Sequence, residues 1–324
     1  MIVIIKHRGR KMICYGIDIG GTKCAVVAAE VSGEKIEILA KEAFPTPKND
    51  PNGILERLYL LLRPMQKKYG KGNIGISCGG PLDEETGIVL GPPNLPGWEY
   101  VEIVKFFEEK TGCKAKLLND ANASALAEWH FGAGTGCKNM VFMTFGTGLG
   151  AGLILNGKLY SGTNGNAGEV GHVRMAPSGP MHYGKKGAWE SFCSGSGIAD
   201  LGKELVKTKP DCALKKEAGA DDNITAKMIA ELARKGDKDC LGVYKKSGRI
   251  LGKGIAFLLD ILNPEKIVIG GVYMRSHDLL DPEMNKVIKK EALPHTAKVC
   301  SVLPAELSEN IGDYAAISAA LEIE

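Results

Sequence analysis

Two glycine-rich turns in the sequence contain residue types that can bind phosphate. One turn consists of Gly20, Gly21, Thr22 and Lys23, and the other of Gly146, Thr147 and Gly148. Glycine leaves backbone N–H groups accessible, and the threonine hydroxyls and the lysine ammonium supply further donors to an anion. Each turn by itself is better explained as a tight connection between two strands. Because the chain has both, and has Gly270 and Gly271 at the end of a later apolar run, we favour a nucleotide phosphate site.

Two widespread phosphate motifs do not fit these turns. The P-loop requires Ser or Thr after a Gly-Lys pair, and no Gly-Lys pair in this sequence is followed by either. Gly146, Gly148 and Ala151 match the pattern GxGxxA, but the residues that follow, GLILNGKLY, have the character of a strand. A dinucleotide fingerprint needs a helix at that point. We therefore expect neither a P-loop enzyme nor a dinucleotide-binding fold.

Two aspartates stand where a carboxylate could take part in phosphoryl chemistry. Asp18 comes just before the first turn and could bind Mg²⁺ directly or through water, since Mg²⁺ prefers few carboxylates and several waters. Asp120 follows an apolar strand at the start of a helix, where aspartate is a common N-cap. From these residues alone, a helix cap is the simpler explanation of Asp120.

The elements that carry the first turn and the two aspartates are predicted from apolar spacing. Residues 12–44 have the pattern of three strands joined by turns, an antiparallel meander. Further strands are expected over 72–78 and 114–119. Helical spacing predicts helices over 52–69, 101–110 and 121–131, with Pro64 as a kink or stop in the first of them.

The second half of the chain begins with a similar pattern. Residues 139–159 again read strand, glycine-rich turn, strand and turn, which suggests two duplicated halves. Residues 155–197 are rich in loops. Beyond them we expect two helices over 226–235 and 245–262, a strand over 265–271 and a helix over 314–321. Strands mixed with helices, in meanders and crossovers, predict an α/β protein with mixed sheets.

Composition excludes several classes of protein. The 324 residues suffice for two domains, and 44% hydrophobic residues provide for a large core. A net charge of +3 gives no reason to expect nucleic acid or an acidic membrane as partner. No run approaches the 18 or so apolar residues of a membrane span, and the apolar run Ile2–Ile5 is too short for a signal peptide. The nine widely spaced cysteines predict free thiols in a cytoplasmic protein.

Four segments in their order along the chain resemble the ROK family of sugar kinases and sugar-responsive repressors. They are DIGGTK at 18–23, NDANASALAE at 119–128, TFGTGLGAGLILNGKLYSG at 144–162 and AGEVGH at 167–172. The resemblance covers nearly the whole chain from about Met12 onward. It implies the two-domain actin-like (ribonuclease H-like) ATPase fold, which is an α/β fold with mixed sheets. In this fold ATP and sugar bind in an interdomain cleft. We expect a small domain of residues 1–119 plus 306–324 and a large domain of residues 120–305.

The resemblance also implies roles for individual residues. Asp120 matches the family's general base, which takes the proton of the attacking sugar hydroxyl. Gly79 and Gly80 line the sugar pocket, and the implied sugar contacts are Asn94, Asn119, Glu169, His172 and Glu190. The implied nucleotide site comprises Asp18, Gly20, Gly21, Thr22, Lys23, Gly146, Thr147, Gly148, Gly270, Gly271 and Val272.

One segment departs from the family pattern. Many members have CxCGxxGCxE after the family histidine, and three cysteines with that histidine bind structural zinc. Here the three cysteine positions hold Met181, Tyr183 and Ala188, while the glycines and Glu190 stay in register. We therefore expect no zinc. A rebuilt site with His172 and His182 has too few ligands, and we expect Tyr183 and Trp189 to fill the metal's place.

The expected activity is that of an ATP- and Mg²⁺-dependent hexose kinase, with glucose and glucose 6-phosphate as the leading substrate and product. N-acetylglucosamine, N-acetylmannosamine, mannose, fructose and allose stay open, because room around the 2-hydroxyl depends on loop conformation. A sugar-sensing repressor is disfavoured, since only about a dozen residues precede the first strand and the charge is near neutral. An actin-like scaffold is disfavoured by the set of sugar-binding residues. A homodimer is expected because dimers are common in the family.

Overall fold

The structure is a computed structural model that describes residues 11–323. The apolar run Ile2–Ile5, which we expect not to be a signal peptide, lies outside the described residues. The chain forms two compact units. Unit 1 extends to Phe142 and includes Gly152–Ala167 and the segment from Glu306 on, and unit 2 comprises Met143–Ala151 and Gly168–Ala305. The boundaries of the functional domains given above stay a prediction.

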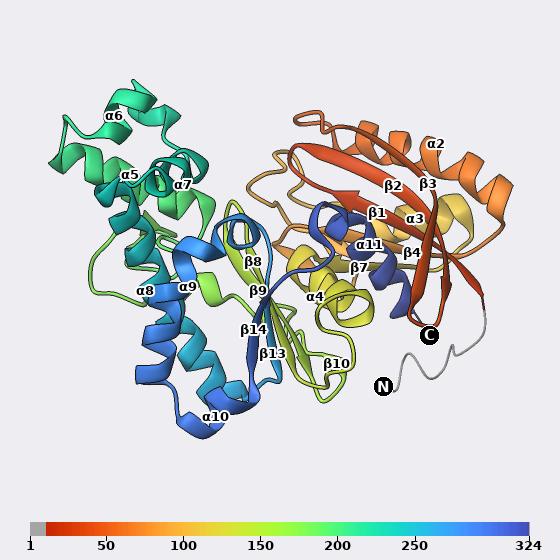
Figure 1. Cartoon of the computed structure of the whole chain (residues 1–324). Coiled ribbons are helices and arrows are strands. Elements are labelled where there is room, and N and C mark those ends of the chain that lie inside the picture. The colour runs from red at the N-terminus through yellow and green to blue at the C-terminus, as the bar shows by residue number, and fades with distance from the viewer. Residues whose placement is uncertain (1–10, 324) are drawn as a thin grey trace. The chain divides into compact units, whose positions relative to one another are not determined.

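Unit 1 contains a five-stranded mixed sheet (Figure 1). Its strands are β1 (Met12–Ile19), β2 (Lys23–Ser32), β3 (Lys35–Pro45), β4 (Asn73–Cys78) and β7 (Ala115–Asn119), in the order β3-β2-β1-β4-β7. The first three strands pair antiparallel, which confirms the predicted meander, whereas β4 is parallel to β1 and β7 to β4. The carboxyl ends of β1, β4 and β7 therefore meet at one edge.

Helices cover both faces of this sheet. Apolar side chains of α2 (Pro51–Tyr69) and α3 (Ile103–Thr111) join the larger hydrophobic core with one face of β1 and β4. The other face packs against α11 (Ile311–Leu321), which also contacts α4 (Asp120–Phe131). Pro64 lies inside α2 and does not end it.

Two glycines let α11 lie directly on the backbone of the sheet. Gly16 of β1 and Gly75 of β4 are partners in the parallel register. A Cβ atom at Gly16 would lie 2.9 Å from the Cβ of Ala316, and one at Gly75 would lie 1.9 Å from the carbonyl oxygen of Ala316. Since α11 presents small residues here as well, helix and sheet approach more closely than larger side chains would permit.

The second sheet repeats the strand order of the first. It consists of β8 (Met140–Phe145), β9 (Leu149–Leu155), β10 (Lys158–Leu159), β13 (Lys266–Ile269) and β14 (Ser301–Pro304), in the order β10-β9-β8-β13-β14. The pair β9–β10 is antiparallel and the pair β13–β14 parallel, as in the corresponding part of the first sheet. The similarity of the two glycine-turn hairpins therefore extends to the arrangement of the sheets around them.

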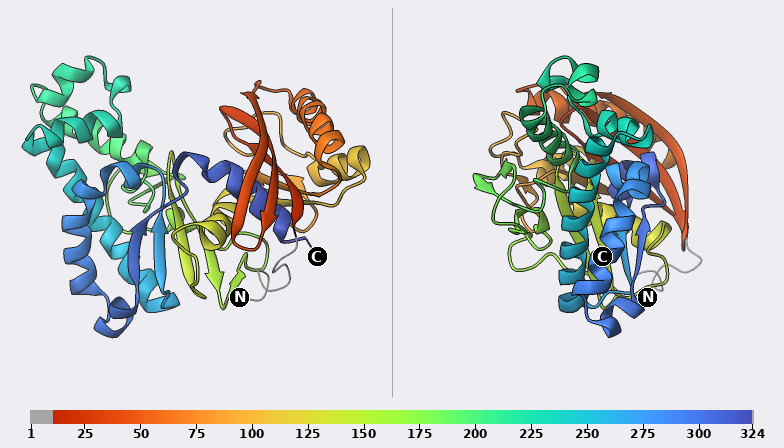
Figure 2. Two further views of the ribbon diagram at one scale, coloured as in Figure 1. Left: turned by 45° about the vertical axis from the view of Figure 1, so that its right-hand side comes forward. Right: turned by 60° about the vertical axis from the view of Figure 1, so that its left-hand side comes forward.

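From residue 195 onward unit 2 is mostly helical, and several of its elements were not predicted. Its helices are α5 (Gly195–Thr208), α6 (Ala213–Ala218), α7 (Ala226–Arg234), α8 (Lys238–Leu262), α9 (Val272–Glu291) and α10 (Pro294–Val299). The elements α5, α6, α9, α10 and β14 were not predicted, and α8 begins earlier than the predicted residue 245. Glycines within α5 and Pro282 within α9 weaken the helical signal. The long helices α8 and α9 lie side by side (Figure 2).

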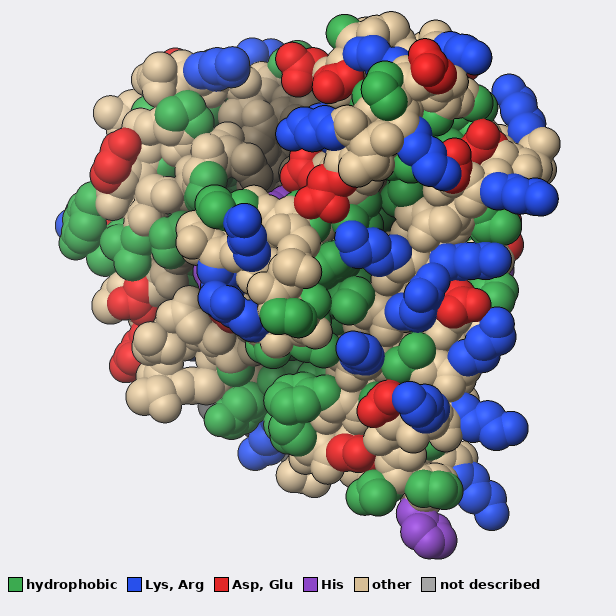
Figure 3. Space-filling model, turned by 90° about the vertical axis from the view of Figure 1, so that its left-hand side faces the viewer, with side chains coloured by type: hydrophobic (Ala, Val, Ile, Leu, Met, Phe, Trp, Pro, Cys, Tyr) green, Lys and Arg blue, Asp and Glu red, His purple; other side chains and the backbone are tan. Residues whose placement is uncertain are grey.

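Charged side chains are mixed on the face of the molecule shown in Figure 3. Lys and Arg side chains are the most numerous there, with Asp, Glu and hydrophobic groups between them. Among residues 11–323, no helix combines the length and the apolar character that crossing a membrane requires.

The close contact between α11 and the sheet predicts a strong effect of one added methyl group. Gly75→Ala should lower the free energy of unfolding by about 1–3 kcal/mol, because overpacking must displace α11 or β4. Gly242→Ala in α8 is the matched control, since a Cβ there meets nothing within 4 Å and should be neutral or slightly stabilising. Thermal and urea denaturation of both variants would measure this, and equal stability of the two would contradict the packing described.

A buried histidine adds a second constraint on unit 1. His130 of α4 is 2% exposed, its ring lies next to that of Trp129, and its Nε2 atom has no hydrogen-bond partner. Burial disfavours the imidazolium ion and lowers the pKa of His130 to about 4. The folded protein therefore holds this side chain neutral at pH values where the unfolded chain would protonate it.

The lowered pKa predicts a loss of stability in acid. Between pH 6.5 and 4 the unfolded state binds the proton that the folded state excludes, so the free energy of unfolding should fall as the pH falls, by about 3 kcal/mol at most from this group. His130→Leu should remove that part of the dependence. Urea denaturation from pH 7 to 4 measures it, with the exposed His295→Gln as control; identical pH profiles for wild type and His130→Leu would exclude this role.

Candidate active site

Several predicted site residues of unit 1 lie at the carboxyl ends of its parallel strands. In the register of the sheet, Asp18 of β1 is opposite Ser77, and Cys78 of β4 is opposite Asn119. Asp18 thus lies near the end of β1, Gly79 and Gly80 follow β4, and Asp120 follows β7. The edge formed by the carboxyl ends of parallel strands is where α/β proteins commonly bind ligands.

The helix cap at the start of α4 is Asn119 and not Asp120. The Asn119 side-chain oxygen accepts a hydrogen bond of 2.9 Å from the backbone N–H of Ala121, and its backbone is extended as in an N-cap. Asp120 is the first residue of the helix, is exposed, and accepts from the same N–H through Oδ1 at 2.8 Å. The cap explanation of Asp120 is therefore wrong, and an exposed carboxylate remains at the helix start.

The two glycines after β4 bring the backbone close to these side chains. A Cβ atom at Gly80 would lie 3.2 Å from Nδ2 of Asn119, and one at Gly79 would lie 3.9 Å from Oδ2 of Asp120. The structure thus places Gly79, Gly80, Asn119 and Asp120 in one group.

Asp18 lies in a region of excess negative charge. Burial raises the pKa of Asp18 to about 6, and the carboxylates of Asp313 and Asp120 add to the effect. Asp313, at the start of α11, is paired with Lys41 at 2.5 Å. Lys23 and Lys41 partly offset this negative charge. Carboxylate oxygens are among the ligands that a hard divalent cation such as Mg²⁺ prefers.

The first phosphate turn packs on the loop that contains Asn94. The N–H of Gly20 donates to the carbonyl oxygen of Lys23 at 3.0 Å, and the Thr46 hydroxyl donates to the Gly20 carbonyl oxygen at 2.6 Å. A Cβ atom at Gly21 would lie 2.7 Å from the Cβ atom of Asn94. A predicted phosphate turn and a predicted sugar residue are therefore neighbours in unit 1.

Glu84 is a site residue that the sequence did not indicate. It lies between the short strands β5 (Leu82–Asp83) and β6 (Ile88–Val89). Its Oε1 accepts from the backbone N–H of Asn119 at 2.9 Å and from the side chain of Asn122 at 2.8 Å, and its Oε2 accepts from the Ser161 hydroxyl at 3.0 Å. Glu84 therefore fixes the start of α4, where Asp120 lies.

In unit 2, the turn between β8 and β9 meets the N-termini of two helices. Gly195 N–H, at the start of α5, donates to the Gly146 carbonyl oxygen at 2.7 Å, and the Ser196 hydroxyl donates to that of Thr147 at 2.7 Å. Gly271, with φ +67°, precedes α9, and a Cβ atom there would lie 2.2 Å from the Phe145 carbonyl oxygen. Two helix N-termini beside a glycine turn favour an anion.

The predicted nucleotide residues of unit 2 are thus brought together. They are Gly146, Thr147, Gly148, Gly270, Gly271 and Val272, and the start of α5 joins them as a part that the sequence analysis did not find. After the GxGxxA pattern the chain continues as strand β9. This agrees with the prediction that the pattern is no dinucleotide fingerprint.

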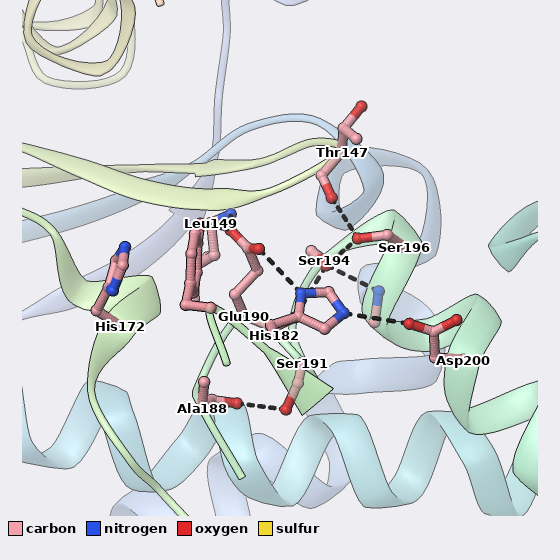
Figure 4. A network of polar contacts seen from close by, with 12 residues as sticks. Thr147, Leu149, His172, His182, Ala188, Glu190, Ser191, Ser194, Ser196 and Asp200 are labelled. Carbon is pink, nitrogen blue, oxygen red and sulfur yellow. Dashed lines mark hydrogen bonds and ion pairs between the residues drawn. The ribbon is translucent and has the colours of Figure 1, made fainter. Parts of the chain in front are cut away.

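A second group in unit 2 surrounds the carboxylate of Glu190 (Figure 4). The Leu149 N–H donates to its Oε2 at 2.8 Å, and a Cβ atom at Gly148 would lie 2.6 Å from the same oxygen. His172 and Glu169 follow on a short helical turn, with 3.9 Å between Nε2 and Oε2. Gly148 is predicted to contact the nucleotide. Because it has no side chain, it also leaves space for the Glu190 carboxylate.

The segment that departs from the zinc motif is held by side-chain contacts. The ring of Tyr183 stacks on that of His172 with 3.6 Å between centroids. Trp189 is buried, and its indole faces Gly254 of α8. Of the two residues expected to fill the metal's place, Tyr183 contacts the ring of His172, whereas Trp189 packs against α8. Among the described residues, no group of three or more His, Cys, Asp or Glu side chains could hold a metal ion.

Comparison with known proteins identifies the family. A family model described as ROK family matches residues 14–322. The chain belongs to the ROK family. It is 30% identical over 309 residues to a glucokinase of Thermotoga maritima, covering 95% of this chain and 97% of the relative. It is 34% identical over 305 residues to a glucokinase of Halalkalibacterium halodurans, covering 92% and 91%.

A solved structure agrees with the fold. The ROK family glucokinase of Streptomyces griseus, in complex with glucose and AMPPNP, superimposes with a TM-score of 0.74 at 31% identity, covering 94% of this chain and 98% of that one. This confirms the predicted class, an α/β actin-like ATPase fold with two mixed sheets. A regulator, NagC of Escherichia coli K12, is 28% identical over 322 residues, which cover 96% of this chain and 77% of the regulator.

The hydrogen bonds of Glu84 predict a role in placing Asp120. Glu84→Gln keeps the shape of the side chain but turns an amide towards at least one of the donors, so the start of α4 should shift. We expect a loss of about ten- to a hundredfold in kcat for sugar phosphorylation, since small displacements of a reacting group are costly. Steady-state kinetics would measure it, with the exposed neighbour Glu85→Gln as matched control. An unchanged kcat in Glu84→Gln would show that the Glu84 carboxylate is not needed to position Asn119 and Asp120.

Proposed function

We propose that this protein transfers the γ-phosphoryl group of ATP to a hydroxyl of a hexose, with glucose as the leading substrate and glucose 6-phosphate as the product. The observation that carries the proposal is the exposed carboxylate of Asp120, which the cap at Asn119 and the clamp by Glu84 hold at the carboxyl edge of the sheet. Glucose is favoured over other hexoses because relatives at 30–34% identity over more than nine-tenths of the chain are glucokinases.

The class of enzyme follows from family membership together with these relatives. The chain is an ATP-dependent sugar kinase. Its relation to a regulator does not conflict with this, because the chain is also similar to glucokinases over almost its whole length. An N-acetylhexosamine or another hexose as substrate is the alternative within the same class.

The proposed chemistry assigns Asp120 as general base. A sugar hydroxyl loses its proton as it attacks the γ-phosphorus, and a carboxylate within hydrogen-bond reach accepts that proton. Asp120 is suited to this because it is exposed and because its backbone is fixed by the first turn of α4. By the family resemblance, Asn94, Asn119, Glu169, His172 and Glu190 would orient the sugar hydroxyls.

The proposed nucleotide contacts come from the two glycine turns. Thr22 and Lys23 would donate to phosphate oxygens, and so would the turn Gly146–Gly148 with the start of α5. Asp18 would hold Mg²⁺, with water and phosphate oxygens as the other ligands. When bound, Mg²⁺ would neutralise negative charge on the phosphate oxygens of ATP. Gly270, Gly271 and Val272 would lie against the adenosine.

We also propose that the protein works in the cytoplasm as a homodimer. The nine cysteines, all described by the structure, are free thiols, as expected in a reducing compartment. Four hydrophobic side chains in α8 and around α10 are at least half exposed, and a second copy could cover them: Phe257, Ile261, Leu293 and Val299.

The decisive experiment is a coupled ADP-release assay with glucose, N-acetylglucosamine, N-acetylmannosamine, mannose, fructose and allose. Wild type should turn over glucose with the highest kcat/KM. Asp120→Asn and Asp120→Ala should lower kcat by about 10²- to 10⁴-fold, as removal of a general base does, while glucose still binds. Undiminished turnover in both variants would remove Asp120 as the base, and no turnover with any sugar would refute the proposed activity.

A further inference from the structure

Glu190 is a buried carboxylate whose position is set by three groups. Its side chain is 10% exposed. Oε2 accepts from the Leu149 N–H at 2.8 Å and from the Tyr183 hydroxyl at 2.6 Å, and Oε1 faces Nδ1 of His182 at 3.0 Å. A carboxylate has about four acceptor positions, two on each oxygen. These contacts leave the second position of Oε1 as the one to which a sugar hydroxyl could donate.

His182 connects this carboxylate to helix α5 (Figure 4). Its side chain is 12% exposed, and its second ring nitrogen faces Oδ2 of Asp200 at 3.2 Å. Both ring nitrogens are therefore engaged with carboxylates on opposite sides of the ring. Asp200 is itself paired with Lys203 at 3.2 Å. The ring thus bridges Glu190 to a charged pair on the helix whose first residues contact the turn at Gly146 and Thr147.

Tyr183 links Glu190 to His172. It lies at the tip of the hairpin formed by β11 (Met181–His182) and β12 (Lys185–Lys186), with a left-handed φ of +52°. Burial of its hydroxyl end and the hydrogen bond to Glu190 raise the pKa of Tyr183 above its ordinary value, so the hydroxyl stays a donor. Since its ring also stacks on His172, one side chain touches two of the proposed sugar-binding residues.

We propose that His182 and Tyr183 are positioning residues that hold the Glu190 carboxylate, as an acceptor, towards a single hydroxyl of the sugar. The inference rests on the proposed kinase function. The hairpin that carries them occupies the segment where the family motif has cysteines, so hydrogen bonds and ring stacking here fix the carboxylate. Asp200 belongs to the same chain of contacts and orients His182.

The first test separates sugar binding from chemistry. His182→Ala and Tyr183→Phe should each raise the KM for the sugar about tenfold, with kcat and the KM for ATP changed less than about twofold, because a contact shared by ground and transition states is weakened. His182→Gln, which retains one donor and one acceptor, should recover part of the loss. His295→Gln on α10 and Tyr59→Phe on α2 are the matched controls.

The second test asks whether the effect passes through Glu190. The KM is measured for each monodeoxy glucose. Glu190→Gln should raise this KM least for the analogue that lacks the hydroxyl which donates to Glu190. His182→Ala and Tyr183→Phe should no longer raise the KM for that same analogue. A general loosening of the loop would raise the KM of all the analogues alike. It would also lower the melting temperature of the Tyr183→Phe variant. That result would overturn the positioning role.

The outcomes for the two proposals are distinguishable. Active wild type with unchanged sugar KM in both variants overturns the positioning role and leaves the kinase proposal standing. Wild type that neither phosphorylates nor, by calorimetry, binds any of the six hexoses overturns the proposed function and this inference with it. Raised sugar KM together with coupling to a single hydroxyl supports both.

Discussion

The close approach of α11 to the first sheet is the contact on which the arrangement of unit 1 depends. At the paired glycines Gly16 and Gly75 no side chain separates the helix from the strands, so an added methyl group there would displace the helix. The same contact brings Asp313 beside Asp18, since a Cβ atom at Gly312 would lie 2.7 Å from the Asp18 carboxylate. The closeness of the Asp313 and Asp18 carboxylates therefore depends on the packing of α11 against Gly16 and Gly75.

Each group of candidate site residues contains a carboxylate that accepts hydrogen bonds from neighbouring segments. Glu84 binds the start of α4, and Glu190 is bound by a strand N–H, a tyrosine and a histidine. Such charge-assisted hydrogen bonds are directional and stronger than neutral ones, so they can fix a loop that has little regular structure. The long stretch from β10 to α5 has only short strands and a helical turn of its own, and these contacts give it shape.

Local sequence was sufficient for the parts of the fold and site that depend on neighbours along the chain. The meander over residues 12–44 and the strand–helix junction at Asp120 follow from apolar spacing and turn residues, and the glycine turns follow from their composition. What could not be predicted depends on distant partners. Glu84 looks like a surface turn residue until Asn119 is placed beside it, 35 positions away. Helix α9 begins at a left-handed glycine and contains a proline, so only its packing against α8 explains it.

The placement of α11 also has a consequence for how the protein is made. Helix α11 completes the core of unit 1, yet unit 2 lies between this helix and the strands it covers along the sequence. Domains usually fold as units during synthesis, with the N-terminal one first. Here α11 is synthesised after unit 2, so the face of the first sheet that carries Gly16 and Gly75 stays uncovered until then, and unit 1 is completed after unit 2 has been made.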